Sequence, residues 1–398
     1  DNITINRALP VAVVQSVVLA GKRVVAVSSG SNFSLAVCDD GTLAAWGVND
    51  DRQLGDGTTT NQRVPVLVNM DSGGFAGKKV SAVVAGGSHS VAISSDGTFV
   101  AYGSCANGQL GKGENPYTRL PVIVTKGTVL SGKTIVGLAA GGLHSMVLCS
   151  DGTLAAWGSN GLGQLGNNSS ANASTPVAVV RSGVLSGKTI TAIAGGGSNS
   201  LARCSDNTLS TWGNNTNGRL GNGSTTYSKV PVAVNRTGVL YRKTIVGASP
   251  WAAVCSDGAL ATWGDNTYGQ LGNNSTTHST TPVLAITTAL RSGEKIVAVH
   301  SGYYYNLAVV AAPPVPTGTT LAASGIGDST CSVAGTVSAN GQTATVSFEY
   351  GLTTGYGWSG VGTPSPVTGT APVGVSAMLT GLLPGKTYHY RVVVASGG

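Results

Sequence analysis

The sequence predicts an all-β protein in which a six-bladed β-propeller precedes a smaller β-sandwich. The first observation is an aromatic–glycine pair that recurs at steps of 56, 55, 55 and 51 residues. The pairs are Trp46-Gly47, Tyr102-Gly103, Trp157-Gly158, Trp212-Gly213 and Trp263-Gly264. The second is composition, with 59 glycines and 10% charged residues in 398, which favours turn-rich β structure over helices. Long repeats built from short β-like runs are typical of propeller blades.

Each repeat reads as four strands. In the third repeat, residues 135–140 form the first predicted strand and residues 145–149 the second. An Asp-Gly pair follows, a strong signal for a two-residue hairpin in which both residues have positive φ. The third strand ends in the aromatic–glycine pair, whose ring should pack between neighbouring blades. A Pro-Val pair then begins a strand suited to a blade's outer edge, where a missing N–H does little harm.

The repeat counts suggest how the ring closes. Within residues 1–310, Pro-Val pairs occur six times, but aromatic–glycine strands occur five times. The last repeat stops after residues 296–310, while the chain opens with a fourth-strand segment at residues 10–14. We therefore expect both ends to share one composite sixth blade and assign residues 1–310 to the propeller, with seven blades as the alternative.

Three phrases recur across the five copies: Gly-Gly-x-His-Ser, Asp-Gly-x-Leu-x-x-Trp-Gly and Gly-Gln-Leu-Gly. Together they resemble the repeat of the regulator of chromosome condensation family over residues 1–310. That family includes a nucleotide exchange factor for the small GTPase Ran and a secreted bacterial inhibitor of β-lactamase. The resemblance thus implies the fold, while function has to be argued from sites.

The proline-rich residues 311–318 predict a stiff linker, and residues 319–398 a second domain. The phrase from Leu382 to Val392 resembles the penultimate strand of a fibronectin type III domain. The resemblance places Tyr388 at the tyrosine corner, where its hydroxyl would bond nearby backbone. It also implies a further strand, for which no sequence follows Gly398. Three explanations of the missing strand stay open: a truncated sequence, a divergent edge, or a strand donated by another copy.

Strand donation would need an acceptor edge and a donor segment. An open edge is a template for an added strand, and the predicted acceptor edge comprises Tyr388, Tyr390, Val392 and Val394. The predicted donor, called here the assembly strand, comprises Asn2, Ile3, Thr4 and Ile5.

The search for chemistry finds no catalytic residues, no metal site and no cofactor site. His89 and His144 share one repeat position, which other repeats fill with Phe, Asn or Tyr, so a structural role in a turn is expected. No histidine–cysteine grouping has zinc spacing, and no phosphate loop or nucleophile motif occurs. The cysteines at one repeat position are expected to be buried free thiols; they are Cys38, Cys149, Cys204 and Cys255.

An aromatic rim is the best candidate binding site. Ser249-Pro250-Trp251 replaces the usual glycine turn in a shortened repeat, and Tyr303, Tyr304 and Tyr305 occupy the same turn in the next. Such a cluster suits sugar stacking or a protein hot spot, although packing that fills the shortened blade explains it as well. One lysine per blade could form a diffuse basic ring, but solubility is the simpler reading; they are Lys22, Lys79, Lys133, Lys188, Lys243 and Lys295.

These observations predict a non-enzymatic protein, secreted to the cell surface or beyond and most consistent with a bacterial source. The net charge of +7 is spread along the chain, so no nucleic-acid partner is expected, and no apolar stretch is long enough to span a membrane. The leading hypothesis is a self-assembling extracellular fibre or surface-layer subunit joined by strand complementation. The alternative is a monomeric module that recognises a glycan or an extracellular protein through the aromatic rim. A propeller that regulates a GTPase or another enzyme is third.

Overall fold

A computed structural model describes residues 2, 9, 11–71, 75–113, 118–291, 293–302 and 305–396. Its strands divide between two compact units. Unit 1 comprises Asp1–Ile286 and Val297–Val309, and unit 2 comprises Thr287–Ile296 and Val310–Gly398. The short helices of the described part are η1 (Val17–Leu19), α1 (Gly127–Leu130), η2 (Gly183–Leu185) and η3 (Thr216–Gly218). None of these is long and apolar enough to cross a bilayer.

Unit 1 contains antiparallel four-stranded sheets, each built from consecutive strands. Sheet 1 contains β1 (Val24–Ser29), β2 (Phe33–Cys38), β3 (Leu43–Gly47) and β4 (Gln62–Leu67). Sheet 2 contains β5 (Val80–Ala85), β6 (His89–Ser94), β7 (Phe99–Gly103) and β8 (Thr118–Ile123). Sheet 3 contains β9 (Ile135–Ala140), β10 (His144–Cys149), β11 (Leu154–Gly158) and β12 (Ala173–Ala178).

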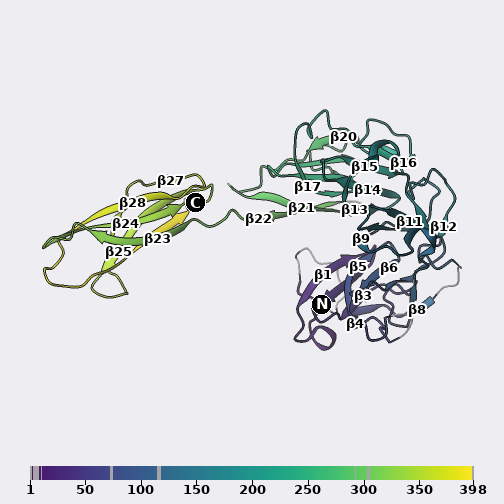
Figure 1. The fold of residues 1–398 in the computed structure, drawn as a ribbon, viewed down its shortest axis with the longest axis horizontal. Coiled ribbons are helices and arrows are strands. Elements are labelled where there is room, and N and C mark those ends of the chain that lie inside the picture. Colours follow the sequence, from purple (N-terminus) through teal and green to yellow (C-terminus); the bar gives the residue numbers. More distant parts are fainter. Residues whose placement is uncertain are drawn as a thin grey trace. The chain divides into compact units, whose positions relative to one another are not determined.

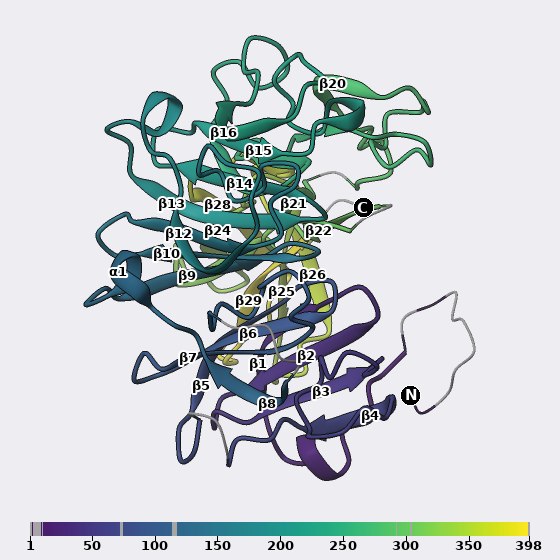
Figure 2. The same ribbon diagram turned by 90° about the vertical axis from the view of Figure 1, so that its right-hand side faces the viewer.

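Two more four-stranded sheets and most of one smaller sheet complete the unit. Sheet 4 contains β13 (Ile190–Gly196), β14 (Asn199–Cys204), β15 (Leu209–Gly213) and β16 (Ser228–Ala233). Sheet 5 contains β17 (Ile245–Ser249), β18 (Ala252–Cys255), β19 (Leu260–Gly264) and β20 (Ser279–Leu284). Sheet 6 pairs β21 (Lys295–Ser301) with β22 (Asn306–Ala311). Sheets 1 to 5 follow one another with their first strands β1, β5, β9, β13 and β17 side by side (Figures 1 and 2).

The hydrophobic core lies between successive sheets. The middle strands β6, β7, β10 and β11 are buried along their whole length. Trp157 from sheet 3 joins a cluster with Val91 and Phe99 from sheet 2. Its ring meets the edge of Phe99 at 5.6 Å between centroids. The predicted packing of the tryptophan between neighbouring sheets is thus confirmed at this junction.

The Asp-Gly turns differ from the predicted geometry. At Asp40-Gly41 the glycine has φ of +89°, whereas the aspartate is not in the positive-φ region. Asp40 Oδ1 instead accepts a hydrogen bond from Thr42 N at 2.9 Å, so the carboxylate stabilises the turn by bonding to the backbone two residues on. The aspartate is a turn former, as predicted, but only the second residue needs a left-handed backbone.

All six cysteines of the sequence are free and buried. Cys38, Cys149, Cys204 and Cys255 occupy the equivalent ends of their strands, and the two others are Cys105 and Cys331. Burial raises the pKa of the Cys149 thiol. The predicted role as small apolar packing residues is confirmed.

The closure of the ring stays a prediction. Residues 11–14 of the predicted fourth-strand segment lie outside any strand, and Pro10 lies outside the described residues. Within the described part, sheet 6 has two strands, β21 and β22.

Unit 2 is built from two facing antiparallel sheets. One contains β23 (Thr317–Ser324), β24 (Thr330–Ser338) and β28 (Val373–Thr380). The other pairs β25 (Thr343–Gly351) with β26 (Trp358–Val361), β27 (Val367–Thr368) and β29 (His389–Ser396). Val333, Val375, Phe348 and Val392 from both sheets share one core. Tyr388 Oη accepts a hydrogen bond from Leu383 N at 3.0 Å, as predicted for a tyrosine corner.

Candidate functional site at the junction of sheets 4, 5 and 6

Unit 1 has two chemically different faces. The loop face carries the turns between first and second strands and the long loops between third and fourth strands, such as residues 159–172. The turn face carries the Asp-Gly turns and the connections between sheets, such as residues 179–189. Because the strands of every sheet run antiparallel, these two kinds of loop lie at opposite strand ends.

A repeated hydrogen-bond arrangement joins neighbouring sheets on the loop face. His89 Nε2 lies 2.8 Å from Ser145 Oγ. Ser145 Oγ donates to the carbonyl oxygen of Gln109 at 3.0 Å, and Trp157 Nε1 donates to the same oxygen at 2.9 Å. One junction further, the same contacts are made by His144, Ser200, Gln164 and Trp212. We call this arrangement the junction latch.

The latch histidines are neutral hydrogen-bond donors. Because Ser145 gives its single hydroxyl proton to Gln109, its oxygen accepts the proton that His89 carries on Nε2. Burial, with the nearby His144, lowers the pKa of His89 to about 3, and burial lowers the pKa of His144 to about 4. Both side chains are fully buried. The predicted structural role of these histidines is therefore confirmed by their contacts.

The latch is replaced at the junction of sheets 4 and 5. Trp251 stands where the latch serine would be, and Pro250 stands where sheet 5 would carry its histidine, because strand register pairs Ala252 with Thr262. Arg219 occupies the position of Gln109 and Gln164. At the junction of sheets 3 and 4, Gly142 N donates to the Gly197 carbonyl at 2.7 Å. In the described structure, Gly197 N makes no corresponding backbone hydrogen bond to the shortened turn that carries Pro250.

Two arginines hold this junction instead. Arg219 Nη2 donates to Asp265 Oδ2 at 2.9 Å. Arg203 Nη1 donates to the carbonyl oxygens of Ile245 and Val246 in the next sheet. Burial disfavours the ionised form of Asp265, but hydrogen bonds from Thr267 and Arg219 outweigh burial, so the pKa of Asp265 lies well below its usual range. The junction thus carries a largely buried ion pair in place of a neutral latch.

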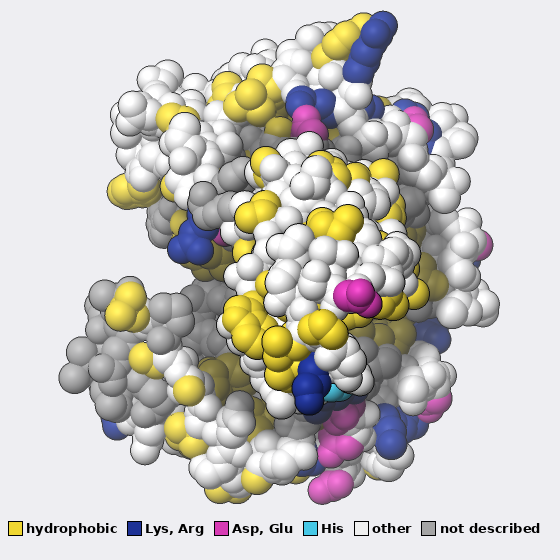
Figure 3. Space-filling view, turned by 90° about the vertical axis from the view of Figure 1, so that its left-hand side faces the viewer, with side chains coloured by type: hydrophobic (Ala, Val, Ile, Leu, Met, Phe, Trp, Pro, Cys, Tyr) yellow, Lys and Arg dark blue, Asp and Glu magenta, His cyan; other side chains and the backbone are white. Residues whose placement is uncertain are grey.

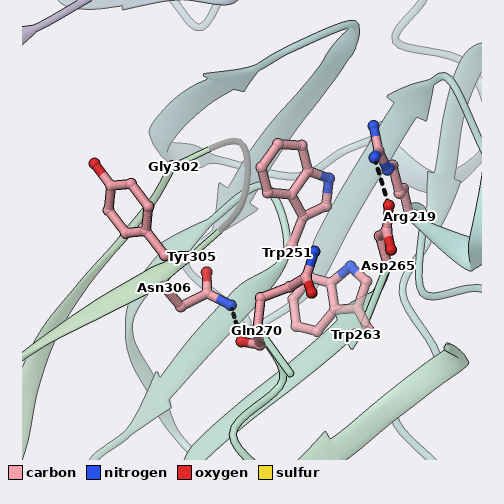
Figure 4. A pocket seen from close by; sticks show the side chains of 8 residues that line it. All are labelled: Arg219, Trp251, Trp263, Asp265, Gln270, Gly302, Tyr305 and Asn306. Atoms are coloured by element: carbon pink, nitrogen blue, oxygen red, sulfur yellow. Dashed lines mark hydrogen bonds and ion pairs between the residues drawn. The ribbon is translucent and has the colours of Figure 1, made fainter. Parts of the chain in front are cut away.

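The indole groups beside this ion pair lack acceptors. Trp251 Nε1 and Trp263 Nε1 are buried without a hydrogen-bond partner in the described structure. The Arg219 guanidinium carbon lies 5.6 Å from the centroid of the Trp251 ring. Figure 4 shows Arg219 and Asp265 facing each other on one side of both indoles, while Tyr305 extends away on the other side. A buried polar group without a partner is costly, which marks this junction as unusual in unit 1.

The enclosed space at the junction is small. A cavity of about 10 Å³ lies among Arg219, Trp251, Trp263, Asp265, Gln270, Gly302, Tyr305 and Asn306 (Figure 4). Roughly 10–15 Å³ holds one water molecule, whereas ligand pockets measure roughly 300–1,000 Å³. The site can therefore offer an external surface to a partner but no pocket for a small molecule.

Sheet 6 supports the site through a different polar contact. Asn306 stands at the position of the latch serine, and its Nδ2 donates to the Gln270 carbonyl at 2.9 Å. Ser301 Oγ donates to Asn306 Oδ1 at 2.5 Å. The side chain of Tyr305 is 58% exposed next to this contact. The polar group is thus satisfied below an aromatic ring that faces solvent.

The titratable groups of the described site contact one another, and His278 Nδ1 lies 3.4 Å from Asp265 Oδ1. His278 Nδ1 accepts a hydrogen bond from Asn266 N at 3.0 Å, and Asp265 accepts from Arg219 and Thr267. No group of three or more potential metal ligands occurs among the described residues. The arrangement suits recognition by ring stacking, by the guanidinium and by a carboxylate.

The predicted site residues fall in three places. Trp251 is 8% exposed, and Tyr303 and Tyr304 lie outside the described residues. Of the assembly strand, Asn2 is described but Ile3, Thr4 and Ile5 are not. The predicted acceptor edge lies at β29 in unit 2 and in the turn before it. On the side away from β25, β29 has no strand neighbour in the described sheets.

Sequence reasoning missed Arg219, Asp265 and Asn306. Their signal is the departure from the repeat pattern, because Arg219 replaces a glutamine and Asn306 a serine. It also missed three aromatic rings in unit 2. Tyr350, Trp358 and Tyr388 have centroids 5.9–6.5 Å apart. Strand register brings Tyr350 opposite Trp358.

Aspartates neutralise five of the lysines on the turn face. Lysines at the starts of sheets pair with the aspartates of the Asp-Gly or equivalent turns, and the pairs are Lys22–Asp40, Lys78–Asp96, Lys133–Asp151, Lys188–Asp206 and Lys243–Asp257. In sheet 2 the pairing residue is Lys78 and not the predicted Lys79. On the side of the molecule drawn in Figure 3, Lys, Arg, Asp and Glu are scattered over a largely uncharged surface.

Comparison with known proteins identifies relatives of this architecture. The family model described as RCC1-like domain matches residues 3–337. The human E3 ubiquitin-protein ligase HERC2 is 32% identical over 289 residues, which is 71% of this chain and 6% of HERC2. The ultraviolet-B receptor UVR8 of Arabidopsis thaliana is 32% identical over 219 residues, which is 55% of this chain and 48% of the receptor. The chain therefore spans less than half of either protein.

Two solved structures share the fold. Human WBSCR16 has a TM-score of 0.62 at 23% identity, with 73% of both chains covered. Prp20p of Saccharomyces cerevisiae has a TM-score of 0.60 at 21% identity, with 73% of this chain and 69% of Prp20p covered. At such identities the likeness concerns the fold alone.

Proposed function

The chain belongs to the family of RCC1-like domains, and we propose that it is a regulatory or interaction module that recognises a protein. The proposed contact area, which we call the rim surface, comprises Tyr268, Tyr305, Trp251 and the Arg219–Asp265 pair on the loop face. Function in this family has to be argued from the site, because one fold serves many functions.

The observation that carries the proposal is the Arg219–Asp265 ion pair that stands in place of the neutral latch between sheets 4 and 5. Exposed aromatic rings flank the substituted groups, since Tyr305 is 58% and Tyr268 is 69% exposed. Tyr268 N donates to Gln270 Oε1 at 2.8 Å, which fixes the loop next to the cavity. Tyrosine, tryptophan and arginine are the residue types most enriched in protein hot spots. The small cavity favours a partner that covers the surface over a ligand that enters it.

The relatives suggest which partners to test. The structure of Prp20p was described together with its binding to Gsp1p and histones. A small GTPase and a histone are therefore reasonable first probes. An exchange-related role is one form that a regulatory module could take. A glycan that stacks on the exposed rings remains the alternative ligand class.

The test measures binding of the full chain to a Gsp1p-type GTPase, to core histones and to a glycan array. For any protein partner we expect Tyr305→Ala combined with Tyr268→Ala to weaken binding at least tenfold. The matched control is Tyr241→Ala, a tyrosine of similar exposure, 59%, on the turn face. Equal affinity of the rim variant and the parent would contradict the proposal, and binding to glycans alone would favour the alternative.

We further propose a non-enzymatic role outside the cell. The non-enzymatic role is supported by the contacts of two titratable groups, because His278 Nδ1 accepts a hydrogen bond from Asn266 N and Asp265 Oδ2 accepts one from Arg219. The location outside the cell is supported by the low content of charged residues, 10%. A secretion assay on the natural source is the direct test of location, and a bacterial source stays a prediction.

Self-association through unit 2 is the second candidate function, favoured by the geometry of β29. Val392 N donates to Thr320 Oγ1 of β23 at 3.0 Å, so the backbone of Val392 faces away from β25, and an added strand would have to replace this contact. Alternation in antiparallel sheets places the backbone groups of Tyr390 and Val394 at the same edge. A strand from a second copy, with Asn2–Ile5 as the proposed donor, could pair there.

Light scattering on the full chain tests this candidate. Strand addition predicts particles much larger than 39.6 kDa, which should dissociate when residues 1–6 are removed. A monomer in both samples would exclude self-association for this chain and leave recognition of a different protein.

A further inference from the structure

A groove on the turn face lies between sheets 2 and 3, away from the rim surface. Its volume is about 490 Å³, within the range of ligand-binding clefts, roughly 300–1,000 Å³. Its walls are the end of β6 with the turn at Asp96-Gly97, the start of β9 with Ile135 and Val136, and Lys126 from the connection between the sheets.

An arginine occupies the corresponding place between sheets 3 and 4. Arg181 Nη1 donates to the carbonyl oxygen of Gly152 at 2.7 Å, and its Nη2 donates to the carbonyl oxygen of Lys188 at 2.7 Å. The guanidinium thus joins the turn of one sheet to the start of the next. Between sheets 4 and 5, Arg236 Nη2 donates to the equivalent carbonyl oxygen, that of Lys243, at 3.0 Å.

The groove between sheets 2 and 3 has a lysine in this place. Lys126, Arg181 and Arg236 each stand seven residues before the lysine that opens the next sheet. No hydrogen bond to the carbonyl oxygens of Gly97 or Lys133 occurs in the described structure. A Cβ added at Gly152 would lie 2.8 Å from Arg181 Nη1, whereas one added at Gly97 would meet nothing within 4 Å. The two acceptors that a guanidinium joins elsewhere are therefore open here.

We propose that this groove binds an arginine side chain of a partner protein. The guanidinium would donate to the carbonyl oxygens of Gly97 and Lys133, as Arg181 does within the chain to Gly152 and Lys188. Arginine suits this arrangement because its planar group presents several donors in a fixed geometry. The methylene groups would pack on Ile135 and Val136.

The open carbonyl oxygens carry the proposal, because the charged groups of the groove are one carboxylate paired with Lys78 and the two lysines Lys126 and Lys133, of which Lys133 is paired with Asp151. The Asp96 carboxylate lines the groove, and hydrogen bonds from Ser94, Lys78 and Thr98 hold the pKa of Asp96 below its usual range. Lys126 is exposed, so its ammonium can stay in water while its chain moves aside. The partner's arginine would enter from solvent, which distinguishes this site from the two filled grooves.

The experiment uses ¹⁵N-labelled full chain and titrates acetyl-Gly-Arg-Gly-amide, with the corresponding Lys and Glu peptides as comparisons. We expect saturable shifts of the Gly97 and Thr134 amide signals with the Arg peptide and at least fivefold weaker binding of the Lys peptide. The variant Lys126→Arg should fill the groove with its own guanidinium and weaken binding of the Arg peptide at least tenfold.

Two further variants change which groove is open and what stands in it. Arg181→Lys recreates the sheet 2–3 arrangement one junction along, so the Arg peptide should now also shift the Gly152 amide signal. Lys126→Met should keep or strengthen binding of the Arg peptide. The absence of saturable shifts in the parent chain, or unchanged binding in Lys126→Arg, would overturn the proposal. Preferential binding of the Glu peptide, lost in Lys126→Met, would overturn it as well and identify an anion site.

Discussion

The two latch histidines should make folding sensitive to mild acid. Their folded-state pKa values of about 3 and about 4 lie below roughly 6.5, the value for an unfolded chain. Between the folded and unfolded pKa values, the unfolded state binds more protons than the folded state. The free energy of unfolding is therefore highest above about pH 6.5 and falls as the pH decreases below it. We predict a loss of about 2 kcal/mol per histidine between pH 7 and pH 5.

Urea unfolding followed by tryptophan fluorescence measures this loss. The double variant His89→Asn and His144→Asn, which copies the asparagine that sheet 4 carries at Asn199, should lose most of the dependence between pH 5 and 7. The control His278→Asn should keep it, because His278 is half exposed and asparagine fills its position in other repeats. A double variant that is as acid-sensitive as the parent would disprove the assignment.

Residue roles set by the repeat were predictable from sequence, and roles set by exceptions to it were not. The structural role of His89 and the free thiols of the repeat cysteines follow from the equivalent positions that these residues hold in different repeats. The Arg219–Asp265 pair joins residues 46 positions apart, and a single sequence does not show which charges meet. Burial of Trp251 likewise depends on how the neighbouring Gly196 and Pro250 pack.

The latch predicts different costs for two equivalent serines. Ser145→Ala removes a donor to Gln109 and also leaves the buried Nε2–H of His89 without an acceptor. Ser90→Ala removes the bond from Ser90 Oγ to the Gln53 carbonyl but breaks no histidine contact, because Phe33 stands where a latch histidine would be. We expect Ser145→Ala to cost about 1–3 kcal/mol more in unfolding free energy.

Paired denaturation curves at pH 7 measure this difference. Equal losses for the two variants would mean that the histidine–serine contact contributes little to the junction.

At the scale of elements, the sequence predicted strands well and turn details less well. The predicted strand 135–140 coincides with β9, and β10 begins one residue before the predicted 145. Alternation and the repeat phrase determine these bounds. The Asp-Gly geometry was wrong because the aspartate side chain bonds to the backbone two residues on, which stabilises a turn with one left-handed residue.

At the scale of the molecule, the repeat predicted one architecture but could not determine how its ends are arranged. Residues 287–296, which the sequence assigns to the propeller, belong to the compact unit that contains residues 310–398. Gly293 packs near Pro313 there. Such a boundary depends on contacts between distant segments and leaves little trace in composition. The predicted divisions at 310 and 318 therefore stay predictions.

The central claim is that the loop face between sheets 4 and 6 recognises a protein, and hydrogen–deuterium exchange of a partner complex tests it most directly. We predict slower exchange on binding in the segments around Tyr268 and Tyr305, with unchanged exchange around Tyr241 on the turn face. Protection confined to the turn face or to unit 2 would contradict the claim and move the recognition surface elsewhere on the chain.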